Sequence, residues 1–148
     1  MAPNTFHIAQ RPTQQTLHPR LGPTALWGYD DGTLGPLYPG PTIEVQKDVP
    51  TTVVYANHLP ATHLLPVDTT MVPGGDPTVR VISHLHGGFV SGADDGNPYH
   101  TAFADEYRQG EVQTVVYPNA QPALRSGTTT TRSGSLGSTC TRAWRVTT

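Results

Sequence analysis

The stretch TIEVQKDVPTTVVYANH, Thr42 to His58, decides the fold class. Apolar and polar residues alternate through Thr42–Lys47, as they do in a β-strand with one buried face. Asp48–Pro50 supplies turn-forming residues, and Thr51–His58 returns to the β-branched and aromatic residues that favour strands. A strand, a turn and a second strand follow one another without a helical period. The stretch therefore predicts a β protein.

Further segments of the same character flank this stretch. They are TALWGYD (residues 24–30), VRVISHLH (79–86) and VQTVVYPN (112–119), separated by loops rich in Pro and Gly. Fifteen Pro and fifteen Gly in 148 residues argue against a helical protein. We predict one all-β domain over residues 23–123, a sandwich or barrel. Residues 1–22 are predicted to form an arm packed on or beside the sheet.

Composition excludes several classes of function. The formal net charge of −2 favours neither nucleic acid nor an anionic membrane surface as a partner. No apolar run is long enough to span a membrane, and the first residues lack the apolar core of a secretory signal, so the expectation leans towards the cytoplasm. The single cysteine, Cys140, excludes an internal disulfide framework. The sequence carries no signature of an oligomeric state.

The C-terminal segment differs in composition from the rest of the chain. Residues 1–123 carry five Lys/Arg and all eleven Asp/Glu, a balance of −6, whereas residues 124–148 carry four Arg and no acid, a balance of +4. This tail, LRSGTTTTRSGSLGSTCTRAWRVTT, shows neither strand alternation nor a helical period. Its composition predicts disorder.

Two histidines one residue apart, in VISHLHGGFV, are the main candidates for chemistry. In a strand, His84 and His86 would point to the same face, with Cα atoms about 7 Å apart. They could then bind one metal ion or two neighbouring ions. Imidazole suits zinc, copper, iron and nickel, so the pair alone does not select a metal. The alternative is that both are polar residues on a solvent-facing strand.

The remaining histidines give weaker signals. They lie around a proline turn, in loops or in the N-terminal arm: His7, His18, His58, His63 and His100. A histidine in such a place usually bonds to the backbone or faces water, and that is the interpretation favoured for all five. Asp94-Asp95-Gly96 is a good turn sequence and by itself indicates nothing more.

Taken in order, the segments resemble the N-terminal cupredoxin domain of laccase-like multicopper oxidases. The resemblance points to the bacterial group that contains spore-coat laccase and phenoxazinone synthase. The matching text is LWGYD, PGPTIEV, NHLPATHLLPVD, HLHGG, the DDG that follows it, and VVYPN, from about Pro23 to Ala123. PGPTIEV together with HLHGG at this separation is far more specific than His-x-His alone.

The resemblance implies a fold, a cofactor and roles for three residues. Such enzymes have three Greek-key β-sandwich domains and couple oxidation of a small-molecule reducing substrate to reduction of O2 to water with copper. By the family pattern, His84 would ligate a type 2 copper and His86 a type 3 copper. Asp95 matches an acid that helps to supply protons to the oxygen intermediates. Neutral imidazoles bind copper, and a carboxylate beside the cluster can relay protons.

The family pattern also requires a WYHDHA-like segment soon after YPN, and the tail has no histidine. Threonine codons are ACN, so reading one base earlier converts each to NAC, which encodes Tyr, His, Asn or Asp. The four threonines 128–131 are thereby compatible with YHDH, and the tail as a whole with WYHDHALG followed by RLNVYAG. We hypothesise that a nucleotide is missing near the codon for Ala123. The alternative is a natural tail of Ser, Thr and Arg.

These interpretations predict an incomplete Greek-key cupredoxin-like β-sandwich with a disordered tail over residues 124–148. The predicted function is that of a copper-binding N-terminal fragment of a multicopper oxidase, inactive by itself because most copper ligands and the type 1 site are missing. Two other classes stay open: a small non-catalytic copper-binding protein, and a sandwich that only binds a partner. A cupin-type mononuclear enzyme is more distant, because nothing supplies its third histidine and its glutamate.

Overall fold

The structure is a computed structural model that describes residues 4–68, 70, 79, 81–97, 111–122, 125–131 and 140–147. Eight strands and no α-helix occur among these residues. Accordingly, no helix in the described part is long and apolar enough to cross a membrane. His100, one of the histidines considered above, lies outside the described residues. The all-β prediction is confirmed.

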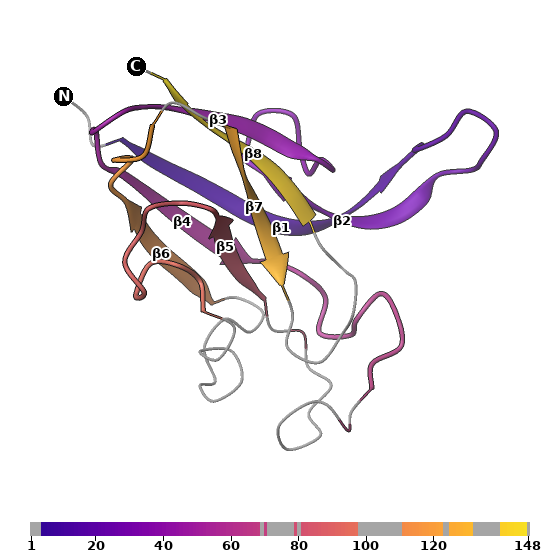
Figure 1. Cartoon of the computed structure of the whole chain (residues 1–148). Coiled ribbons are helices and arrows are strands. Elements are labelled where there is room, and N and C mark those ends of the chain that lie inside the picture. Colours follow the sequence, from indigo (N-terminus) through magenta and orange to yellow (C-terminus); the bar gives the residue numbers. More distant parts are fainter. Residues whose placement is uncertain are drawn as a thin grey trace.

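The strands form two four-stranded sheets, which pack as a sandwich (Figure 1). The first sheet has the order β2 (Thr24–Asp30), β1 (Thr5–Gln15), β4 (Thr51–Asn57) and β6 (Val112–Tyr117). The second has the order β3 (Gly40–Gln46), β8 (Cys140–Thr147), β7 (Arg125–Thr131) and β5 (Ile82–His86). The β1–β4 and β3–β8 pairs are parallel and the others are antiparallel.

The larger of two hydrophobic clusters among the described residues lies between the sheets and draws on both. Its buried members are Ile8, Tyr29, Ile43, Val45, Val53, Tyr55, Leu85, Val115, Tyr117, Trp144 and Val146. The PGPTIEV motif contributes through Ile43 and Val45, and through a close backbone contact. A Cβ on Gly40 would lie 2.7 Å from the Tyr29 Cβ, so only glycine fits there. The alternation read from this motif is thus confirmed as the inner face of β3.

Within the predicted N-terminal arm, Thr5–Gln15 is a strand inside the first sheet. β1 pairs with β4 on one side and with β2 on the other, so the prediction that it packs on or beside the sheet is wrong. The sequence of β1 shows no clear alternation of apolar and polar residues, because Gln10 faces inward and residue 12 is a proline. Pro12 lies beyond the part of β1 that pairs with β4, where a missing N–H costs no ladder bond on that side.

The predicted disorder of the tail is also wrong, for residues 125–131 and 140–147. They form β7 and β8, which pair with each other and lie between β3 and β5 (Figure 1). Without them the second sheet would consist of two strands with no partners, and the core would lose Trp144. Threonine is β-branched and favours strands when neighbours are available, which a composition argument ignores. The sandwich predicted as incomplete therefore has both sheets.

Candidate metal centre

His84 and His86 lie on β5, at the edge of the second sheet. Leu85 between them is buried in the core, so the two histidines occupy the opposite face of the strand. Their ring centroids are 5.9 Å apart and the rings are inclined by 36°. His86 is exposed and His84 partly buried. The prediction that both imidazoles share one face is confirmed.

Asp95 lies directly beside His84. Nδ1 of His84 is 2.6 Å from the backbone oxygen of Asp95 and 3.3 Å from its carboxylate Oδ1. A carbonyl oxygen only accepts hydrogen bonds, so Nδ1 carries the proton and donates. Nε2 of His84 then has a lone pair for a metal ion. A ligating histidine that donates its other N–H to a carbonyl or carboxylate is the usual arrangement in metal sites.

The loop that carries Asp95 is pinned against β5 and β6. Gly96 has a φ of +72°, and a Cβ there would lie 2.0 Å from the carbonyl oxygen of Ser83. Asp94 accepts hydrogen bonds from the backbone N–H of Val116, at 2.9 Å, and from the Ser91 hydroxyl, at 2.7 Å. The turn expected at Asp94-Asp95-Gly96 is therefore also what presents the Asp95 carbonyl to His84.

The described residues supply a donor pair and not a complete metal site. No group of three or more His, Cys, Asp or Glu side chains that could hold an ion occurs in the described part of the chain. The donors present nevertheless fit copper: two imidazoles on one face, one of them with its tautomer fixed. Structural sites normally use three or four protein ligands. The described residues therefore provide two imidazole ligands, and a complete site would need one or two more.

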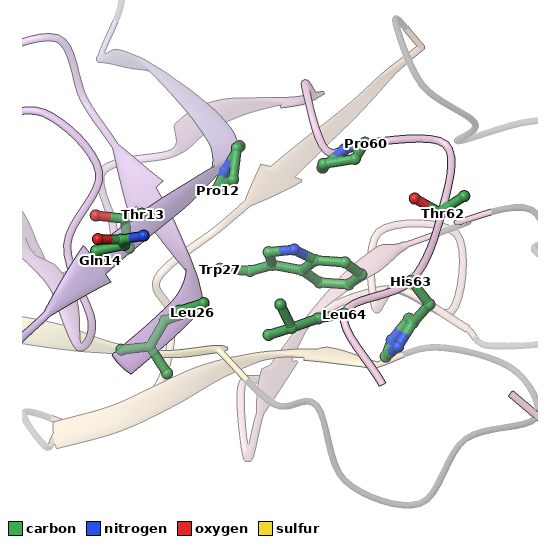
Figure 2. Close-up of a pocket in the computed structure, with 10 residues that line it drawn as sticks. Pro12, Thr13, Gln14, Leu26, Trp27, Pro60, Thr62, His63 and Leu64 are labelled. Carbon is green, nitrogen blue, oxygen red and sulfur yellow. The ribbon is translucent and has the colours of Figure 1, made fainter. Parts of the chain in front are cut away.

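The other described histidines have structural roles or lie apart from β5. Nδ1 of His63 accepts a hydrogen bond from the Leu65 N–H at 3.0 Å, and Nδ1 of His18 accepts one from the Arg20 N–H at 3.2 Å. The His63 ring also meets Trp27 edge to face, with centroids 4.6 Å apart, at the rim of a cavity of about 510 Å³ (Figure 2). Backbone bonding, the favoured interpretation for both, is confirmed.

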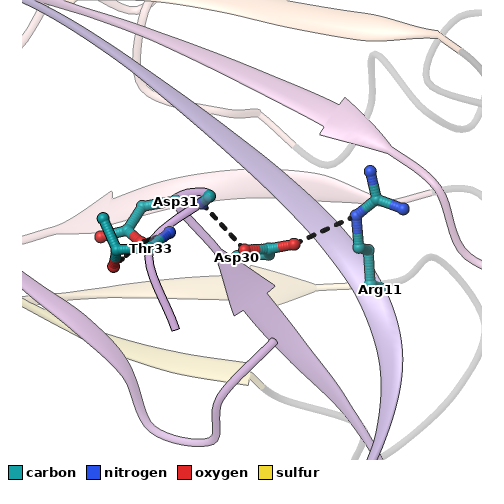
Figure 3. Close-up of polar contacts among 5 residues, drawn as sticks. Arg11, Asp30, Asp31 and Thr33 are labelled. Atoms are coloured by element: carbon teal, nitrogen blue, oxygen red, sulfur yellow. Dashed lines mark hydrogen bonds and ion pairs between the residues drawn. The ribbon is translucent and has the colours of Figure 1, made fainter. Parts of the chain in front are cut away.

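A second cavity, of about 350 Å³, is lined by His7 and His58 and lies over the outer face of the first sheet. Its charged rim is an ion pair in which Arg11 Nε is 3.3 Å from Asp30, whose carboxylate also accepts the N–H of Gly32 (Figure 3). The carboxylate is thus already paired with a cation and a backbone donor. This cluster is structural.

Known proteins resemble the chain in sequence and in fold. A laccase from Bacillus subtilis (strain 168) is 35% identical over 124 residues, covering 78% of this chain and 23% of that protein. A rice protein (Oryza sativa subsp. japonica), multicopper oxidase LPR1 homolog 3, is 37% identical over 117 residues, covering 74% and 21%. A crystal structure of a multi-copper oxidase from Pseudomonas thermotolerans matches with a TM-score of 0.68 and 20% identity, covering 98% and 29%. No protein-family model matches the chain.

The fold is that of a cupredoxin-like β-sandwich, the domain type of the multicopper oxidases. By sequence, the chain belongs with the laccase-like multicopper oxidases over most of its length. It spans about a quarter of the length of the curated relatives it matches. The resemblance predicted from PGPTIEV and HLHGG is confirmed, while the roles given to His84, His86 and Asp95 stay predictions.

Proposed function

We propose that the chain is the N-terminal copper-binding domain of a laccase-type oxidase, with His84 and His86 as copper ligands. The observation that carries the proposal is the bond from His84 Nδ1 to the Asp95 carbonyl, which in the neutral imidazole makes Nε2 the nitrogen with a lone pair, on the strand face shared with His86. Bound copper would supply the one-electron chemistry that couples oxidation of a small-molecule reducing substrate to reduction of O2 to water. The two histidines that this proposal assigns in the described part of the chain are too few for that reaction by themselves.

Asp95 is assigned the proton-handling role in this proposal. Its carboxylate Oδ1 is 3.3 Å from His84 Nδ1, and its side chain is 42% exposed, so it contacts both the imidazole and water. A carboxylate in that position can take a proton from solvent and hold it beside a copper ligand. Its backbone oxygen meanwhile fixes the ring. One residue would therefore orient the ligand and carry the proton.

The register of β7 indicates where further ligands would lie. Residue 129 pairs with His84, and residue 131 pairs with Ile82. Read one base earlier, the codons of residues 129 and 131 are those compatible with the two histidines of the family's second motif. Register partners in an antiparallel pair face the same side. The hypothesis of a missing nucleotide thus places the second histidine pair beside the first.

Copper binding by the 148-residue chain is the direct test. Competition with a chromophoric chelator should show that His84→Ala weakens copper binding at least tenfold, because one of two donors is lost. His18→Ala serves as the matched control, since His18 bonds to the Arg20 N–H between β1 and β2, in the other sheet's hairpin, and it should leave the affinity unchanged. Equal affinities in the wild-type chain and His84→Ala would overturn the assignment of His84.

Two double variants test the ligand register. Thr129→His with Thr131→His should raise the copper affinity, because both new imidazoles join the face of His84 and His86. Thr128→His with Thr130→His adds the same two residues one position away, on the opposite face, and should not raise it. If both pairs act alike, the face assigned to the site is wrong.

A nucleotide read across the codons for Gln121 to Trp144 tests the missing base itself. An additional base that restores WYHDH would make the product a full laccase-type protein at this motif. A confirmed sequence without it would favour a second candidate, a small non-catalytic copper-binding protein. The observation in favour of that candidate is that the chain as written closes its second sheet, with Trp144 fully buried.

A further inference from the structure

The backbone of Ser83, next to His84, is held by buried side chains of the opposite sheet. Gln113 of β6 accepts the Ser83 N–H at 2.8 Å through Oε1 and donates to the Ser83 carbonyl at 2.9 Å through Nε2. Gln10 of β1 donates to the Ser83 hydroxyl at 2.9 Å. The exposed fractions are 0% for Ser83, 3% for Gln10 and 5% for Gln113. We call these three residues the amide clamp.

The clamp bonds to the backbone of β5 as a neighbouring strand would. Among the strands that the structure describes, β5 is at the edge of its sheet and pairs with β7. The Gln113 amide offers one donor and one acceptor to a single residue, as a paired strand does. Buried backbone groups are almost always bonded, and Gln113 satisfies two of them on the side of β5 where the described residues place no strand. It also fixes the separation between β5 and β6, which lie in opposite sheets.

The same strand, β6, positions the loop that orients the His84 ring. The backbone N–H of Val116 donates to Asp94, and the loop then brings Gly96 onto the Ser83 carbonyl and Asp95 onto His84 Nδ1. The His84 backbone and the carbonyl that fixes its tautomer are therefore both anchored to β6. A shift of β5 against β6 would break the bond between Nδ1 and the Asp95 oxygen.

We propose that Gln113, assisted by Gln10, is a positioning residue for the metal centre: it sets the tautomer and the direction of His84 through Ser83. The proposal rests on the proposed function where it concerns copper. Its structural part, the tautomer of His84, can be read without metal. Replacement of residues that orient a metal ligand typically costs about ten- to a hundredfold in metal affinity, and that is the loss expected here.

The test uses Gln113→Leu in the full 148-residue chain. Nitrogen-15 correlation spectra, recorded without metal and above the ordinary pKa of imidazole, should show His84 protonated at Nδ1 in the wild-type chain and shifted towards Nε2 in the variant. Copper competition should show a tenfold or greater loss. An unchanged His84 tautomer in folded Gln113→Leu overturns the proposal. A tautomer change without copper binding in either chain keeps the clamp and overturns the proposed function.

Asn119→Gly is the matched control for lost buried hydrogen bonds. Nδ2 of Asn119 donates to the Val49 carbonyl at 2.7 Å and to the Thr51 hydroxyl at 3.0 Å, at 1% exposure and away from β5. Its φ of +55° is one that glycine tolerates. Asn119→Gly should leave the His84 tautomer unchanged. A shifted tautomer in this control would overturn the role proposed for the amide clamp. If Gln113→Leu does not fold, Gln10→Leu replaces it, since this change removes only the bond to the Ser83 hydroxyl. A shift of the His84 tautomer in Gln10→Leu supports the proposal, and an unchanged tautomer overturns it.

Discussion

The two sheets of the sandwich are built from sequences of different character. Three strands of the first sheet, β2, β4 and β6, come from segments whose pattern predicts strands. Half of the second sheet, β7 and β8, comes from a tail whose composition predicts disorder. Both sheets have four strands, and they share one core. The difference shows that a strand pattern is sufficient for a strand here but not necessary, because β3 and β5 offer edges on which the tail can pair.

Trp144 of β8, the largest fully buried side chain, tests whether the tail contributes to the core that the two sheets share. It is 0% exposed, and its ring meets Tyr117 of the first sheet edge to face at 5.0 Å. Trp144→Ala should lower the free energy of unfolding by about 3–5 kcal/mol, because it leaves a large cavity. Urea unfolding followed by circular dichroism measures this. A loss below about 1 kcal/mol would mean that the tail contributes no core.

The loop beside His84 gives the next largest effect and tests how the second sheet supports the site. Gly96→Ala should cost about 2 kcal/mol, since a φ of +72° is strained for alanine and its Cβ would clash with the Ser83 carbonyl. Gly92→Ala lies in the same loop with no atom within 4 Å of a new Cβ, and it should stay within about 0.5 kcal/mol. Equal losses in denaturant unfolding would contradict this packing.

The free energy of unfolding should depend on pH through Tyr117, which lies in the core that the two sheets share. Burial raises the pKa of the Tyr117 hydroxyl well above its usual value, and the neighbouring Tyr55 hydroxyl opposes this only in part. The folded state keeps the proton that the unfolded chain releases near pH 10, so stability is complete below that pH and falls as the pH rises above it. The slope due to this group reaches about 1.4 kcal/mol per pH unit. Tyr117→Phe should flatten the fall in unfolding experiments from pH 8 to 11, and a profile identical to wild type would show that Tyr117 ionises as freely when folded.

The smallest expected effect concerns the surface of β8. Arg145 Nη1 lies 2.6 Å from Glu44 Oε1 of β3, with side chains 38% and 58% exposed. An exposed ion pair contributes about 0–1 kcal/mol and less at high salt. A double-mutant cycle with Arg145→Ala and Glu44→Ala should give a coupling in that range that shrinks in 1 M salt. A larger, salt-independent coupling would mean that the β3–β8 edge depends on charge more than on the burial of Trp144.

Much of the fold and half of the site could be predicted from local pattern. Alternation in Thr42–Lys47 and the spacing of His84 and His86 report directly on faces of strands, because side chains alternate within a single strand. β1 escaped prediction since its inward residue Gln10 is polar. Gln113 is likewise polar and faces inward, and its role becomes visible only once Ser83 is placed against it. A buried amide is recognisable only from its partner.

The sequence by itself determined the class of the protein, the β3 and β4 strands, and the shared face of His84 and His86, because each is written within a few consecutive residues. Only the tertiary structure decided that the tail forms β7 and β8, that Asp95 binds His84 Nδ1, and that Gln113 holds Ser83. These contacts join residues far apart in the chain, or depend on unpaired strand edges that exist only once the rest has folded. The physical reason is that hydrogen bonding and burial are satisfied across the whole molecule, while periodicity records only the local part of that balance.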